Sequence, residues 1–231
     1  MRIRILTLSL TILCLALTAS AGTIFSEGPI DGNDNGFFVT GPSFPNIGGT
    51  YQDISNGFVA ANSGSANDFE WGEWSVGAPT AFSVTFGTGA FVNNGGLTGC
   101  PGGNCQFDFA QNAGNSTLLF TNSFGYGIYD VKVNLNADIN MVAGSTYWVT
   151  VSNATDAGND GTQAWDIPNG GSGGPATCNF RQSGVNDGDC GLGGESFTIS
   201  SGTTTPEPSS ILLFGSGILG LAGVLRRKLN R

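Results

Sequence analysis

The chain has 231 residues, a formal net charge of −9 at pH 7, 38 glycines and no histidine. Of its eight Lys and Arg, only Lys132 and Arg181 lie away from the two ends, against sixteen Asp and Glu (seventeen in the chain, less Glu207 near its end). Phosphate backbones require clustered basic side chains, so this balance argues against nucleic-acid binding. Without histidine, a Ser-His-Asp or Cys-His nucleophile cannot be assembled.

The N-terminus has the form of a secretory signal peptide. Arg2 and Arg4 precede an apolar run. Ala19 and Ala21 are small residues at the two positions that signal peptidase recognises. The alternative is an uncleaved anchor helix, but the apolar run is short for one. We therefore expect residues 1–21 to be a signal peptide that is cleaved after Ala21.

Residues 22–203 are expected to form one extracytoplasmic domain, since no linker divides them and they suffice for a sizeable core. No stretch sustains a helical period, whereas several short segments alternate polar and apolar residues. Strands with one dry face must pack against a second sheet, which predicts an all-β, antiparallel β-sandwich or jelly-roll-like domain. The expected strands are 81–86, 106–109, 129–135, 146–151 and 196–199.

A candidate calcium loop lies near the start of this domain. Asp31, Asn33 and Asn35 match the first half of a calcium-binding loop, Asp-x-Asn-x-Asn-Gly. Pro42 stands at the twelfth position, where such a loop needs a bidentate Glu, and turns favour the same residues. We expect no other cofactor or metal.

Tryptophans and carboxylates follow each other closely over residues 70–74. Trp71, Trp74 and the more distant Trp165 are candidate glycan contacts, because indoles stack on the C–H faces of sugars; the alternative is burial in the core. Glu70 and Glu73 resemble the carboxylate pair of a glycosidase, but residues three apart on a strand point to opposite faces. We therefore expect no catalytic residues.

Four cysteines remain in the domain: Cys100, Cys105, Cys178 and Cys190. An even count in an exported chain predicts two disulfides, for which three pairings exist. Local pairing, Cys100 with Cys105 and Cys178 with Cys190, is favoured because both intervals are rich in turn residues. Zinc is the rival explanation, but the spacing does not suit it and no histidine is present.

The C-terminal tail has the form of a membrane anchor. Residues 209–225 are uncharged and predominantly apolar, and a helix of 17 residues is about 25 Å long, near the lower limit for crossing the hydrocarbon layer. Arg226, Arg227 and Lys228 follow as a basic stop, which the positive-inside rule keeps in the cytoplasm. The sequence thus predicts a C-terminal transmembrane helix behind an exported domain.

A Pro-Glu-Pro triplet, Pro206, Glu207 and Pro208, precedes this apolar segment. The tail contains this triplet, then an apolar stretch interrupted by glycines, and then a basic end. In this order the three parts resemble the PEP-CTERM sorting signal over residues 204–231. The resemblance implies that an exosortase, a membrane-embedded cysteine protease of Gram-negative bacteria that make extracellular polysaccharide, recognises the triplet. Thr205 departs from the Val of many relatives.

The domain also resembles, more loosely, β-sandwich domains that often precede such tails. The strand over 144–151 and the asparagine-glycine loop over 93–99 carry this resemblance. It supports the fold and adds little about function.

We therefore expect a non-enzymatic structural or adhesive protein of the cell envelope or extracellular matrix. Its precursor would be anchored in the inner membrane, and its mature form would reach the cell surface or the medium. One alternative is a carbohydrate-binding module that contacts extracellular polysaccharide. A second is a glycoside hydrolase, which would need two carboxylates within about 10 Å in a cleft.

Overall fold

A computed structural model of the chain describes residues 22–33, 35–41, 52–110, 115–158, 163–168 and 174–202. Residues 22–202 form one compact unit, and its only named helical element is a short 3-10 turn. The elements are β1 (Thr23–Ser26), β2 (Gly36–Phe38), β3 (Gln52–Val59), β4 (Gly64–Ser75), β5 (Pro79–Gly87), η1 (Pro101–Gly103), β6 (Gln106–Phe109), β7 (Asn115–Thr121), β8 (Gly127–Met141), β9 (Thr146–Asp156), β10 (Ala164–Asp166), β11 (Gly174–Gln182), β12 (Val185–Gly194) and β13 (Phe197–Ser200).

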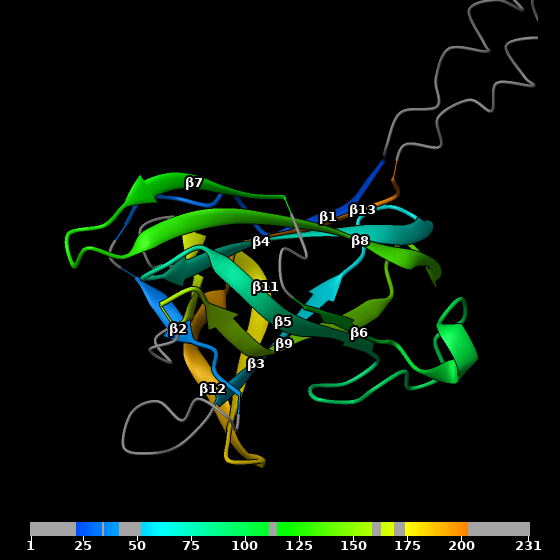
Figure 1. Ribbon diagram of the computed structural model, residues 1–231. Coiled ribbons are helices and arrows are strands. Elements are labelled where there is room, and N and C mark those ends of the chain that lie inside the picture. The colour runs from blue at the N-terminus through cyan, green and yellow to red at the C-terminus, as the bar shows by residue number, and fades with distance from the viewer. Residues whose placement is uncertain are drawn as a thin grey trace, which may run out of the picture. The chain divides into compact units, whose positions relative to one another are not determined.

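The strands form two antiparallel sheets, seen as two layers in Figure 1. In the first sheet β8 lies between β7 and β4, and both β13 and β10 pair with the other edge of β4. β1 continues beyond β13, and β2 continues beyond β10. The second sheet has the order β12-β11-β3-β9-β5-β6. The predicted all-β antiparallel sandwich is confirmed.

The core lies between the sheets and is built by alternation along the strands. Phe82, Val84 and Phe86 of β5 are buried, as are Val131 and Val133 of β8. The residues between them on β8 point away from the core and are polar. Because successive side chains of a strand point to opposite faces, each of these strands contributes one apolar face to the core.

Aromatic rings fill the middle of this core. The rings of Trp71 and Trp165 lie 5.6 Å apart, centroid to centroid, in an edge-to-face arrangement. Phe82 packs 5.3 Å from Trp71, and Phe197 packs 5.8 Å from Trp165. Such edge-to-face pairs stabilise a core beyond the area that they bury.

Two disulfides connect residues that are close in sequence. Cys100 is bonded to Cys105, and Cys178 is bonded to Cys190. The favoured local pairing is therefore confirmed. The first bond closes the turn that contains η1, and the second joins β11 to its neighbour β12.

Three of the sequence predictions concern residues outside the described ranges. These are the signal peptide with Ala19 and Ala21, the sorting triplet, and the apolar segment over 209–225 with its basic stop. Within the described part of the chain, no helix is both long enough and apolar enough to cross a membrane.

Candidate functional site

The three tryptophans proposed as glycan contacts are all buried. Trp71 and Trp165 have no exposed surface, and Trp74 is 8% exposed. The Trp165 Nε1 donates to the Ser196 carbonyl at 2.8 Å, and the Trp74 Nε1 donates to the Asp166 carboxylate at 3.0 Å. The expectation of an exposed platform at these residues is wrong, because each indole lies against a packed sheet, where it buries a large apolar area.

The fourth tryptophan, Trp148, is half-buried. It lies on β9 between the inward-facing Tyr147 and Val149, so it points to the outer face of the second sheet. Its register partners on both sides are glycines, Gly57 and Gly87. A methyl group at Gly57 would come within 2.7 Å of the indole, so the ring lies across this glycine. Alternation along β9 could have identified Trp148 as the outward-facing tryptophan.

The same outer face carries a polar groove with a volume of about 290 Å³. Strands β3, β5, β6, β9 and β11 form its floor, and the loop after β5 forms one wall. The lining is hydroxyl, amide and charged except for one aromatic ring. The lining residues are Asp53, Thr85, Phe91, Asn93, Gln106, Thr150, Ser152, Asn153 and Arg181.

An ion pair and an aromatic ring meet at one end of this groove. The Arg181 Nε donates to the Asp53 carboxylate at 2.8 Å, and its Nη2 contacts the same oxygen. The guanidinium carbon lies 4.8 Å from the centroid of the Phe91 ring, a cation–π contact. Burial raises the pKa of Asp53, and the neighbouring Arg181 opposes that rise. The arrangement fixes a guanidinium at the groove, with its side chain about one-third exposed.

Hydroxyl groups connect this end of the groove to the loop. The Thr150 hydroxyl donates to the Ser55 hydroxyl at 2.9 Å, deep in the groove floor. The Ser55 oxygen also accepts the backbone N–H of Phe91 at 3.4 Å. On β5 and β6, the Ser83 hydroxyl donates to Asp108 at 2.8 Å, and the groove residue Gln106 donates to the same carboxylate oxygen at 2.9 Å. Side chains that are bonded in this way are held in fixed orientations.

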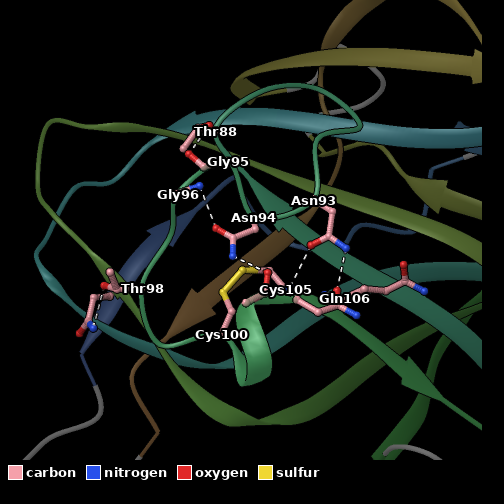
Figure 2. The surroundings of a disulfide bond; sticks show 12 residues. Thr88, Asn93, Asn94, Gly95, Gly96, Thr98, Cys100, Cys105 and Gln106 are labelled. Carbon is pink, nitrogen blue, oxygen red and sulfur yellow. Dashed lines mark hydrogen bonds between the residues drawn. A yellow bond between two sulfur atoms is a disulfide. The ribbon is translucent and has the colours of Figure 1, made fainter.

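Residues 88–105 form the loop that borders the groove, and Figure 2 shows how it is fastened. The Cys100–Cys105 disulfide closes its second half. The Asn93 side chain accepts the Cys105 N–H at 2.9 Å and donates to the Asn104 side chain at 2.7 Å. The two halves of the loop are thereby joined across the turn, which holds the groove wall in place.

Asn94 adds a second bracket to the same loop (Figure 2). Its Nδ2 donates to the Gly103 carbonyl at 2.5 Å, and its Oδ1 accepts the Gly96 N–H at 2.8 Å. Asn94 itself has a φ of 70°, a left-handed conformation that Asn tolerates better than most residues. The asparagine-glycine composition of this loop thus has a structural reason.

Two groove residues have left-handed backbone conformations. Phe91 has a φ of 59° and Asn153 has a φ of 55°, although neither is glycine. Such conformations cost of order 1–3 kcal/mol and cluster at functional sites. Both residues line the groove, so the strained positions and the polar concavity coincide.

The paired carboxylates expected for a hydrolase are arranged differently. Glu73 is fully buried, whereas Glu70 is partly exposed on the opposite face of β4. Glu70 and Asp130 both bond the Lys132 ammonium, at 3.4 and 2.8 Å, beside a second depression on the first sheet. Burial raises the pKa of Glu70, and Asp130 adds to the rise while Lys132 opposes it. This group is a cross-strand ion-pair network, with Lys132 directly opposite Glu70 in register.

The candidate calcium residues form a turn that is fastened to the sandwich. The Asp31 carboxylate accepts the Asn33 N–H at 3.0 Å, and the Asp31 N–H donates to Asp166 at 3.0 Å. Burial raises the pKa of Asp166 to about 6, although hydrogen bonds from Trp74, Asp31 and Ser196 oppose the rise. Asn35 begins the next described segment, 35–41. The observed bonds account for the turn. Calcium binding at Asp31, Asn33 and Asn35 stays a prediction.

A cluster of potential metal ligands lies near the second disulfide. The sulfurs of Cys178 and Cys190 and a carboxylate oxygen of Glu195 lie within 4.8 Å of one another. Both sulfurs are bonded to each other, so neither is a thiolate that could bind a metal. The cluster therefore does not form a thiolate metal site.

Comparison with known proteins identifies the tail. Residues 204–228 match the family model described as the PEP-CTERM protein-sorting motif. The matched range contains Pro206, Glu207 and Pro208 and ends at Lys228, which confirms the resemblance drawn from the sequence. Neither the curated proteins nor the solved structures contain a match to the chain. The match covers the tail and does not extend to the sandwich domain.

Proposed function

We propose that the sandwich domain is a structural and adhesive module of the cell surface or extracellular matrix. The PEP-CTERM motif in the tail supports an exported protein that an exosortase processes. In this proposal the tail holds the precursor in the inner membrane, and processing then releases the domain to the outside. The acidic composition supports this role, because it keeps the domain soluble and away from anionic lipid.

Adhesion in this proposal occurs through glycan binding in the groove of the second sheet. The observation that carries it is the fixed Asp53–Arg181 pair beside Phe91 in a concave, hydroxyl- and amide-lined surface. Sugars offer many hydroxyl groups, which need oriented donors and acceptors, and apolar C–H faces, which need an apolar wall. The groove contains oriented donors, oriented acceptors and an apolar ring. The carbohydrate-binding alternative is thus favoured, with different residues from those first expected.

The Arg181 guanidinium has donors to spare for a ligand. Two of its nitrogens contact Asp53, and Arg carries five N–H donors in a planar fork. A charged donor that is held in place by a neighbouring carboxylate can bond a hydroxyl or carboxylate oxygen without first losing its own conformational freedom. We propose no catalytic role for the groove.

We expect Arg181→Lys to weaken binding to the host's extracellular polysaccharide about tenfold, a loss of about 1.4 kcal/mol. Lysine can keep a charge pair with Asp53 but loses the planar fork. Retention on immobilised polysaccharide, measured with the full chain in detergent, checks this. The matched control is Lys132→Arg in the first sheet, which should bind like the wild type. Equal retention of all three proteins would contradict the proposal.

A further inference from the structure

A second candidate site lies inside the sandwich, near the end of β4. Glu73 has no exposed surface, and its register partner across β10 is Trp165, so both side chains point into the core. Neither carboxylate oxygen of Glu73 has a hydrogen-bond partner among the described residues. A buried carboxylate without donors is costly unless it is neutralised or binds a metal ion.

A second buried carboxylate lies at the same end of the sandwich. Asp156, at the end of β9, is 3% exposed and accepts the N–H of Gly77 at 2.8 Å, in the turn that follows β4. Burial raises the pKa of Glu73 well above its usual range, and the charge on Asp156 raises it further. Asp156 thus places a second buried acid at the end of the sandwich where β4 leads into β5, a few residues beyond Glu73.

An unpartnered amide lies on the same inward face. Gln163 stands two residues before Trp165, so it points to the same side of the sheet as Trp165 and Glu73. It has no exposed surface, and neither its amide oxygen nor its amide nitrogen has a partner among the described residues. The interior therefore contains one carboxylate and one amide, on the same inward face of the first sheet, that both lack partners among the described residues.

No basic side chain can neutralise these acids. Between residues 22 and 202 the sequence contains two basic residues, Lys132 and Arg181, and no histidine. Lys132 bonds Glu70 and Asp130, and Arg181 bonds Asp53. The charge of the Glu73 carboxylate must therefore be neutralised by a proton or by a bound cation.

We propose that Glu73, Asp156 and Gln163 bind a calcium ion between the two sheets. Ca²⁺ prefers carboxylate and amide oxygens, tolerates irregular geometry and needs no nitrogen or sulfur ligand. A Ca²⁺ ion there would connect β4, β9 and the segment before β10, and would remove the repulsion between the acids. The site is separate from the groove, so it does not depend on the glycan proposal.

Thermal unfolding of the full chain in detergent, with CaCl₂ or with EDTA, tests this site. We expect Ca²⁺ at a hundredfold excess over its Kd to raise the Tm by about 5 °C or more. Glu73→Gln should abolish the Ca²⁺-dependent shift, because the amide keeps the shape and removes the charge. Asp68→Asn, on the outer face of the same strand, should keep the full shift. Asp31→Asn should keep it as well, which separates this site from the 31–36 turn.

Terbium luminescence tests the wild type directly, even if Glu73→Gln fails to fold. Tb³⁺ in this site should give emission sensitised by indole excitation, since Trp165 is the register partner of Glu73, and Ca²⁺ should displace it. Absence of both the Tm shift and the sensitised emission would overturn the proposal and leave Glu73 as a protonated acid. A shift that persists in Glu73→Gln, or that disappears only in Asp31→Asn, would overturn it too.

Discussion

Trp165→Ala is expected to lower the free energy of unfolding by about 3–5 kcal/mol, the range for a fully buried aromatic residue. The indole has no exposed surface, and its ring lies within 6.3 Å of those of Phe69, Trp71 and Phe197. Its removal also takes away one of the two donors to the buried Ser196 carbonyl and leaves only the Gly72 N–H, at 3.2 Å. Denaturant unfolding, followed by far-ultraviolet circular dichroism, measures the loss.

Trp148→Ala is the matched control for this variant. Its indole is half-buried on the outer face of the second sheet, so truncation should cost about 1 kcal/mol and leave the core intact. An equal loss of stability in both variants would contradict the assignment of Trp165 to the core and Trp148 to the surface.

The second large effect concerns pH. Glu27 and Glu195 are both buried, and burial raises the pKa of Glu27 to about 7 and that of Glu195 to about 8. The hydrogen bond from the Ala176 N–H opposes the rise at Glu27, the nearby Asn56 side chain opposes the rise at Glu195, and the charge on Glu27 adds to the rise at Glu195. The Cys178 sulfur also lies 3.0 Å from a Glu195 oxygen.

The direction of the pH effect on stability follows from the protonation of Glu195 in the folded and unfolded states. In the unfolded chain a Glu loses its proton near pH 4.5, whereas folded Glu195 keeps it to about pH 8. Between these values the unfolded state gains charge that the folded state resists, so stability falls as pH rises. We expect Glu195 to account for on the order of 3–5 kcal/mol of this fall.

Glu195→Gln should flatten this dependence. The amide cannot ionise, so the variant should lose less stability than the wild type between pH 5 and pH 8.5 in urea unfolding. Glu27 and Asp166 should still contribute a smaller slope in the same direction. A wild type whose stability does not change over this range, or a variant with the same slope, would contradict the assignment.

Part of the fold could be predicted because alternation is a local property. The segments 81–86, 106–109 and 129–135 lie within β5, β6 and β8, and their apolar residues face the core. β11 and β12 were not predicted, because their glycine, asparagine and aspartate residues are typical of turns. Pairing of β11 with β3, which is not a local property, holds these strands in the second sheet, and the Cys178–Cys190 bond joins them to each other.

The groove could not be derived from local pattern. Asp53, Phe91 and Arg181 belong to two strands and a loop that are far apart in sequence, and only the sheet order β11-β3-β9-β5 brings them together. One signal was available, since Arg181 is one of two basic residues in an acidic domain. The preference for Trp71, Trp74 and Trp165 failed because residue type does not reveal which face of a strand is buried.

The central claim is that the second sheet carries the glycan-binding surface, and nuclear magnetic resonance tests it most directly. Oligosaccharides from the host's extracellular polysaccharide should shift the backbone amide signals of Phe91, Asn93, Gln106 and Arg181 in a saturable manner. Signals from the first sheet, such as that of Lys132, should not move. Saturable shifts on the first sheet alone, or no shifts at all, would contradict the claim.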